Sequence, residues 1–202
     1  MSQSHTLTNK SAGISLLAPL RRCLRHRGFT LLELMTTVAI VSIVAATAAP
    51  SLSSLVRSIQ TTSISNTFIS QLQLARSEAI KRNDRVVLCK SATGAACANS
   101  GEWSQGWIVF HDANNNAQLD SGETVIRQEG PIYGGMRFSG NRNVAHYVSY
   151  MPTGVAKLVG GAFQAGTFDL CESSVQNGVV TQIVLSSTGN PRLHKAQNTP
   201  CV

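Results

Sequence analysis

One run of 21 residues, 29–49, is almost wholly apolar and contains a single charged side chain, Glu33. At about 1.5 Å per residue, a helix of this length extends about 31 Å, which matches the hydrocarbon core of a bilayer. A lone carboxylate in hydrocarbon costs on the order of 3 kcal/mol, so it needs a cationic partner. Cleavage after Gly28 would supply one, because the new amine of Phe29 lies four residues from Glu33 on the same helix face. The run therefore predicts a membrane-anchored helix that begins with an assembly signal.

The segment before this run, 1–28, predicts the orientation of the chain. It carries five basic residues, Lys10, Arg21, Arg22, Arg25 and Arg27, and no acidic residue. Basic flanks stay in the cytoplasm, so we expect a cytoplasmic leader, one pass through a bacterial inner membrane and a periplasmic remainder. Without the leader the chain has 12 basic and 10 acidic residues, a net charge of +2 instead of +7. The overall basicity is therefore poor evidence for nucleic-acid binding.

Residues 29–49 also allow two other interpretations. The run would also suit an ordinary signal anchor in which Glu33 has no role, or a secretory signal peptide cleaved near the small residues 45–49. Its length opposes both, because it spans a full hydrocarbon core, whereas the apolar region of a signal peptide is normally shorter. We expect the anchor to survive processing.

The sequence GFTLLEL at residues 28–34, followed by the apolar run, resembles the start of type IV prepilins and type II secretion pseudopilins. The resemblance implies that a membrane-embedded prepilin peptidase cuts after Gly28 and N-methylates Phe29. It also implies that Glu33 sets subunit register in a helical filament. The implied partners are other pilins or pseudopilins, the peptidase, and the secretion or pilus machinery of the inner membrane.

Beyond the anchor, the pattern predicts an α+β fold. Apolar residues recur at three- and four-residue spacing over 50–84, so the helix continues in amphipathic form past Pro50, which would kink it or loosen one turn. From Arg85 the period changes, and seven strands are expected, at 86–90, 107–110, 124–127, 132–138, 147–151, 167–171 and 179–186. A long helix packed on an antiparallel sheet domain, 85–202, is the type IV pilin-like layout.

The cysteines fit an oxidising compartment. Cys23 would leave with the leader, and the remaining Cys89, Cys97, Cys171 and Cys201 allow three pairings. Proximity in the sequence favours Cys89–Cys97 and Cys171–Cys201, and periplasmic oxidation favours disulfides over a metal site. Their spacing is not a zinc pattern.

A second resemblance narrows the family. The sequence GWIVFHDANNN at residues 106–116, the later strand 123–127 and the segment SSTGNPR at 186–192 resemble the GspH/FimT group of minor pilins and pseudopilins. The positions of Cys171 and Cys201 agree with this group. The resemblance implies a minor subunit at a filament tip in type II secretion or type IV pilus biogenesis.

The loop from Asp112 to Glu123 has a calcium-like pattern, since Asp112, Asn114 and Asn116 alternate and Glu123 is the twelfth residue. However, Ala117 replaces the glycine of that pattern, and strands flank the loop. Asn and Asp are also common in hairpin connections, so a polar hairpin loop is the simpler interpretation. No other cofactor is expected.

The sequence also bears on enzymatic and DNA-binding functions. The chain lacks G-x-S-x-G, H-E-x-x-H and a Gly-rich strand-to-helix loop, so no enzyme is predicted. FimT-like DNA receptors carry a C-terminal Gly-Arg-x-Arg motif; here Asn190 replaces the first arginine. Arg192, Lys195 and Arg142 remain candidate phosphate contacts, which makes a DNA-binding minor pilin the alternative function. A solvated C-terminal segment is the simpler interpretation of these residues.

Overall fold

The computed structural model describes residues 28–173, 178–199 and 201, with only the backbone described for residues 47–51, 178, 198 and 199. The predicted leader lies outside this part of the chain except for Gly28. One helix, α1 (Leu31–Arg82), comes first and is 52 residues long. The chain divides into two compact units, the first ending at Ala48 and the second beginning at Ala49, and each is described by itself.

Local signals set both ends of α1. The hydroxyl of Thr30 accepts the backbone N–H of Glu33 at 3.2 Å, which is an N-terminal cap. At the other end, Asn83 adopts a left-handed conformation with φ 52° directly after Arg82, as C-terminal caps commonly do. Pro50 lies within the helix without ending it. The end predicted at Asn83-Asp84 is therefore confirmed.

In the first unit, the described side chains of α1 are all exposed. Every side chain from residue 31 to residue 46 is exposed to solvent, including Leu34, Ile40 and Val44. Within the part of the chain that the structure describes, no helix combines the length and apolarity needed to cross a membrane. The predicted span 29–49 ends among residues whose side chains lie outside that part, and the anchor stays a prediction.

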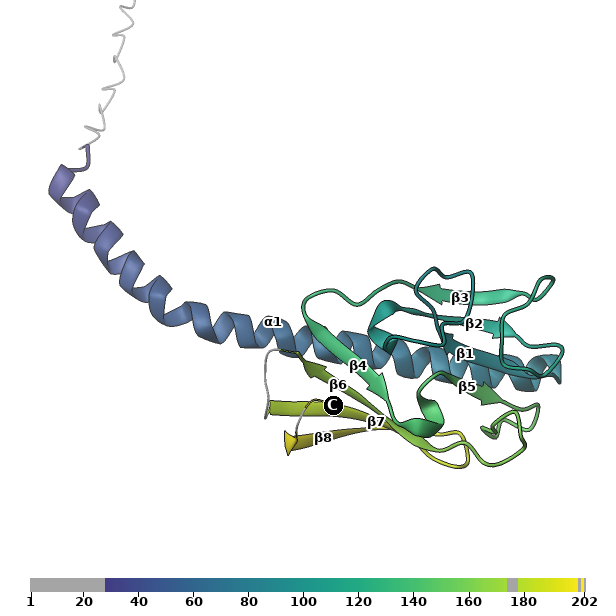
Figure 1. Cartoon of the computed structure of the whole chain (residues 1–202). Coiled ribbons are helices and arrows are strands. Elements are labelled where there is room, and N and C mark those ends of the chain that lie inside the picture. Colours follow the sequence, from purple (N-terminus) through teal and green to yellow (C-terminus); the bar gives the residue numbers. More distant parts are fainter. Residues whose placement is uncertain (1–27, 174–177, 200, 202) are drawn as a thin grey trace, which may run out of the picture. The chain divides into compact units, whose positions relative to one another are not determined.

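The second unit contains two antiparallel four-stranded sheets alongside α1 (Figure 1). Sheet A has the order β3-β2-β1-β5 and sheet B the order β4-β6-β7-β8. The strands of sheet A are β1 (Val86–Lys90), β2 (Trp107–His111), β3 (Val125–Glu129) and β5 (Tyr147–Tyr150). Those of sheet B are β4 (Met136–Gly140), β6 (Gly166–Glu172), β7 (Gly178–Leu185) and β8 (Pro191–Thr199). Short 3₁₀ turns, η1 (Trp103–Gln105) and η2 (Arg142–Val144), complete the fold.

Phe68 of α1 stands at the centre of the main core. Its ring makes edge-to-face contacts with four others at centroid distances of 4.8–5.3 Å, namely Trp103, Trp107, Phe138 and Phe168. These rings come from η1, β2, β4 and β6, so α1 packs against both sheets. Leu72, Ala75 and Ala79 extend the same buried stripe along the helix. The amphipathic half of α1 is therefore part of the folded second unit.

A smaller core covers the other face of sheet A. Val87, Cys89, Ile108 and Phe110 are fully or almost fully buried there beneath Ala117, which belongs to the loop after β2. That loop and the nearby disulfide loop closed by Cys97 thus protect the second face of the sheet.

The structure contains the disulfides Cys89–Cys97 and Cys171–Cys201, with Cα separations of 5.6 and 5.9 Å. These are the pairings that proximity in the sequence favours. The first closes a short loop after β1. The second ties the residue beyond β8 to β6, next to the segment that is not described.

The α+β class is confirmed, but two details differ from expectation. The strands form two sheets rather than one, because the connections after β3, β4 and β5 each cross from one sheet to the other. In addition, β8 occupies a segment expected to be a solvated tail. Its composition hides it: β8 has one large aliphatic residue, Leu193, among basic and amide side chains. Such a composition is typical of an edge strand.

Candidate functional site

The predicted cleavage site lies on an open stretch of backbone. Residues 28–30 precede the helix and are exposed. A Cβ added at Gly28 would meet nothing within 4 Å, and the Phe29 side chain is 78% exposed. A peptidase needs such an accessible, non-helical segment, because the scissile bond must enter its active site.

Glu33 lies in the first turn of α1, where its negative charge is favourable with respect to the helix dipole. Its side chain is exposed, and no ion pair to its carboxylate occurs among the described residues. Thr30, which caps the helix, is a residue that the sequence reasoning missed. The signal was present as Thr-x-x-Glu, the capping-box pattern. Thr30 thus fixes the helix start and, with it, the position of Glu33 relative to Phe29.

Polar side chains in this part of α1 satisfy their own hydrogen bonds. The hydroxyls of Thr36, Thr37 and Ser42 donate to helix carbonyls three or four residues earlier, at 3.0, 2.9 and 2.8 Å. Such internal bonding leaves no unpaired donor when a helix is buried in apolar surroundings. Glu33 is therefore the one described side chain of residues 31–46 whose burial demands an external partner.

The loop from Asp112 to Glu123 is held by its own side chains. Buried Asp112 accepts the backbone N–H groups of Asn116 and Ala117 at 3.1 and 2.9 Å. Glu123 accepts those of Ala113 and Asp120 at 2.9 and 3.1 Å. Burial raises the pKa of the Asp112 carboxyl, the two backbone bonds opposing the shift. The acidic side chains thus act as backbone acceptors that shape the hairpin.

This arrangement bears on the calcium hypothesis. Ala117 takes φ 60° without being glycine, and its methyl group fills the smaller core, so the departure from the calcium pattern has a packing reason. Among the described residues, no group of three or more His, Cys, Asp or Glu side chains is placed to hold a metal ion.

The candidate DNA contacts do not share one face. In the register of β7 and β8, Lys195 pairs with Thr181 and Leu193 with buried Ile183, whereas Arg192 pairs with Val184. Since neighbouring residues of a strand point to opposite faces, Lys195 lies on the inner face of sheet B and Arg192 on the outer face. Arg142 lies apart in η2. DNA binding through these residues stays a prediction.

The turn before β8 is docked on α1. Asn190, at the position of the missing motif arginine, accepts a hydrogen bond from Arg76, and the buried Tyr150 hydroxyl donates to the Gly189 carbonyl at 3.0 Å. Burial raises the pKa of Tyr150, so this donor keeps its proton. An arginine at position 190 would place a second cation beside Arg76. The turn therefore has a structural role in this chain.

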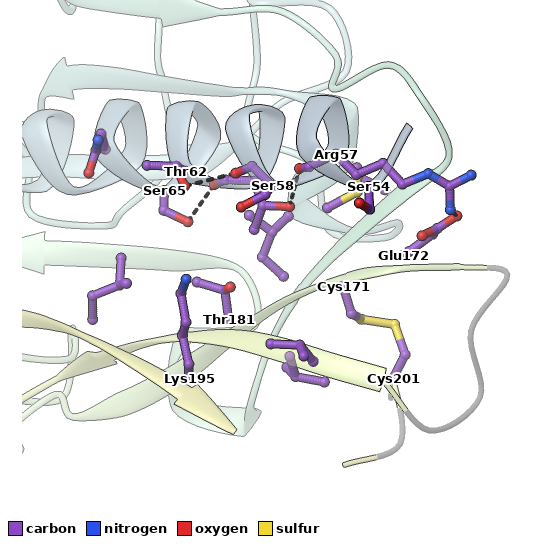
Figure 2. A pocket seen from close by; sticks show the side chains of 17 residues that line it. Ser54, Arg57, Ser58, Thr62, Ser65, Cys171, Glu172, Thr181, Lys195 and Cys201 are labelled. Atoms are coloured by element: carbon purple, nitrogen blue, oxygen red, sulfur yellow. Dashed lines mark hydrogen bonds and ion pairs between the residues drawn. A yellow bond between two sulfur atoms is a disulfide. The ribbon is translucent and has the colours of Figure 1, made fainter. Parts of the chain in front are cut away.

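A groove of about 380 Å³ runs between the Ser/Thr-rich face of α1 and the inner face of sheet B (Figure 2). Its helix wall includes Ser54, Ser58, Thr62 and Ser65. Its sheet wall includes Val179, Leu193 and Lys195, and its far end carries the Cys171–Cys201 disulfide. An ion pair between Arg57 and Glu172 joins helix and sheet at that end.

Comparison with known protein families assigns this chain to a family. A family model described as type II transport protein GspH matches residues 65–189, more than half of the chain. The chain belongs to the GspH family. A second model, the prokaryotic N-terminal methylation motif, matches residues 23–49 of this GspH-family protein and so covers Gly28, Phe29 and Glu33.

The solved structure of a minor pilin agrees with this fold. The type IV minor pilin FimU of Pseudomonas aeruginosa strain PAO1 is 16% identical; the match covers 68% of this chain and 90% of FimU, with a TM-score of 0.51. The minor pseudopilin EpsH from the type 2 secretion system of Vibrio cholerae is 8% identical, with coverage of 68% and 97% and a TM-score of 0.44. No curated protein matches the chain significantly.

Family and motif together establish the general role of this GspH-family protein. It is a minor pilin or pseudopilin subunit of a type II secretion or type IV pilus system. The fold expected from the sequence resemblance is confirmed by the FimU likeness.

Proposed function

We propose that prepilin peptidase cleaves this subunit after Gly28, and that the subunit then enters a filament through residues 29–49. The proposal rests on the arrangement of residues around the predicted cleavage site. An open Gly28-Phe29 segment is followed by a capped helix with Glu33 in its first turn and apolar side chains exposed all around. Apolar surface of this extent favours burial against lipid or against neighbouring helices.

Cleavage and assembly are coupled through charge. Cutting after Gly28 creates an amine at Phe29, which N-methylation leaves basic. Four residues later, Glu33 supplies the opposite charge on the same helix face, so the amine pairs with Glu33 of its own chain or of a neighbour. An unpaired carboxylate in the apolar filament core costs on the order of 3 kcal/mol. The pairing thus selects one register of subunit against subunit.

The cellular location of each part of the chain follows from the leader, the apolar helix and the disulfides. The basic leader remains cytoplasmic before cleavage, residues 29–49 anchor the precursor in the inner membrane, and the two-sheet unit lies in the periplasm. The disulfides Cys89–Cys97 and Cys171–Cys201 support an oxidising compartment. We place the assembled subunit at a filament tip, where it acts structurally and catalyses no reaction.

The test is incorporation of a Glu33→Ala variant together with its partner pilins. The variant should remain membrane-bound and cleaved, while the amount recovered in filaments or in complexes with partner pilins falls by about 100-fold, the equivalent of 3 kcal/mol. Thr37→Ala is the matched control, because Thr37 lies in the same exposed part of the helix and bonds only to the Leu34 carbonyl. Normal incorporation of Glu33→Ala would contradict the pairing.

Secretion and pilus assembly are then separated by deletion of the gene. Loss of secreted proteins with normal surface pili would assign the subunit to type II secretion, and the reverse result would assign it to a type IV pilus.

A further inference from the structure

The groove between α1 and sheet B lies beside an open sheet edge. In the described part of the chain, β8 has a strand neighbour, β7, on one side only. An unpaired edge presents a row of backbone N–H and C=O groups that pair readily with another extended segment. Since β8 is nine residues long, it offers an edge long enough for a stable addition.

Side chains on β8 make this edge selective. Leu193 and Lys195 lie on the face that lines the groove, together with Val179 of β7. Leu193 and Val179 are 45% and 59% exposed, so the groove carries uncovered apolar surface. Figure 2 shows the Lys195 side chain extending from β8 toward the helix, and Lys195 has no ion-pair partner among the described residues.

The helix wall of the groove is built to accept hydrogen bonds. The hydroxyls of Thr61, Thr62 and Ser65 donate to helix carbonyls four residues earlier, at 2.8–2.9 Å. Their protons are therefore used within the helix, while the oxygen lone pairs of the less buried Thr61 and Thr62 remain available. The wall suits a ligand with N–H donors, and the Lys195 ammonium opposite suits an anionic group.

The charges at the groove favour an acidic occupant. At the disulfide end, Arg57 and Glu172 neutralise each other, so Lys195 supplies the uncompensated charge. Along β8, Arg192 and Lys195 are cationic and no acid is present. A second copy of this chain, paired antiparallel along the full length of its own β8, would place the two Lys195 side chains opposite each other, which is destabilising. A partner of opposite charge avoids this cost.

We propose that β8 and the groove bind an extended, acidic segment of another protein, which adds as a fifth strand to sheet B. Its apolar side chains contact Leu193 and Val179, and its carboxylates pair with Lys195. Backbone pairing provides affinity, while Lys195 and the apolar surface of Leu193 and Val179 provide selection. The inference goes beyond the proposed filament role, because it requires neither cleavage at Gly28 nor pairing by Glu33.

The test uses the full chain purified in a nonionic detergent and two fluorescent decapeptides, measured by polarisation. Both carry threonine at every second position, on the face directed away from the groove; the positions between alternate valine with glutamate in one peptide and valine with lysine in the other. The glutamate peptide should bind at least about tenfold more tightly, and N-methylation of its alternate amides should abolish binding, because strand addition needs those donors. Amide hydrogen exchange at residues 192–199 should slow when the glutamate peptide is bound.

Variants locate the site. Lys195→Glu should weaken binding of the glutamate peptide by about tenfold or more, and Lys195→Arg should preserve it. The matched control is Arg192→Glu, which makes the same charge change on the opposite face of β8 and should weaken binding by about threefold or less. Failure of both peptides to bind would overturn the proposal, as would equal effects of the two charge reversals.

Binding of duplex DNA is a separate outcome. If duplex DNA binds with the same dependence on Lys195 and the glutamate peptide does not bind, the groove is assigned to nucleic acid and the proposal is overturned. Each of these results leaves the cleavage and incorporation tests unaffected.

Discussion

Two stretches of the same helix behave in opposite ways. Residues 31–46 are apolar around the whole helix, and all of their side chains are exposed. Between residues 64 and 79 the apolar side chains form one stripe, and Phe68 and Leu72 are completely buried. A one-sided helix finds its partner within its own chain, whereas a helix that is apolar all around needs apolar surroundings on every side. We infer that α1 encodes folding in its second part and assembly in its first.

The largest effect should come from Phe68→Ala. Removal of a ring that contacts four other aromatic rings leaves a large cavity, and we expect a loss of about 3–5 kcal/mol in the free energy of unfolding. Leu34→Ala, a change to the exposed stretch, should alter it by less than about 0.5 kcal/mol. Urea denaturation followed by tryptophan fluorescence measures both. A comparable loss for Leu34→Ala would break the comparison between the two stretches.

Next in size is the disulfide from Cys171 to Cys201. Replacing both cysteines with serine should lower the free energy of unfolding by about 3.5 kcal/mol in the loop-entropy model. The same replacement of Cys89 and Cys97 should lower it by about 2.5 kcal/mol, because that disulfide closes a loop of 8 residues rather than 30. Both changes lie in the second unit and should leave processing at Gly28 unaffected. Urea denaturation of the two double variants compares them directly. A larger loss for the shorter loop would contradict the entropic explanation.

The turn before β8 should give a smaller effect. Gly189 has φ 81°, and a Cβ there would lie 2.9 Å from both the Gly154 carbonyl oxygen and Tyr150 Cε1. We expect Gly189→Ala to lower the free energy of unfolding by about 1–3 kcal/mol. Gly160→Ala is the control, since its Cβ would meet nothing within 4 Å. Equal melting temperatures for the two variants would show that the turn is not packed against β5 as described.

The smallest effect concerns pH. His111 lies 2.8 Å from Asp84, and this hydrogen bond, with a smaller contribution from the backbone N–H of Arg85, lowers the pKa of Asp84 below 3.8. Because the folded pKa is depressed, the stabilisation is present above pH 3.8 and is lost as the pH falls through the folded pKa. Asp84→Asn should therefore lower the free energy of unfolding near pH 7, by only about 0.5–1 kcal/mol because the pair is partly exposed. Below the folded pKa of Asp84 the substitution should have no effect on the free energy of unfolding. Urea titrations at several pH values test this, and a constant difference would contradict it.

The sequence predicted most of the elements that bury apolar residues. The 3.6-residue period from Ile64 to Ala79 identified the packed part of α1, and alternation in segments such as 107–110 identified sheet strands. These predictions succeeded because the same side chains form the core. The strand β8 was missed for the complementary reason: an edge strand beside a groove buries little, so its sequence shows almost no apolar pattern.

Other features of the fold are set by contacts between residues far apart in the sequence. The separation of the strands into two sheets depends on loop paths that no local pattern specifies. The packing of Ala117 beneath its loop, at φ 60°, also depends on contacts distant in the sequence. Arg192 and Lys195 are close in the sequence and were both candidate phosphate contacts, but the register of β7 and β8 places them on opposite faces. The N-terminal signal, by contrast, is local, and it was visible in residues 28–34.

The most direct test of the central claim is the intact mass of the chain, expressed with and without an active prepilin peptidase. We predict that the peptidase converts the full chain into a product beginning at Phe29 and carrying one added methyl group. Gly28→Leu should retain the full mass under the same conditions. An unchanged mass for the parent chain, or cleavage of Gly28→Leu at the same bond, would contradict the account.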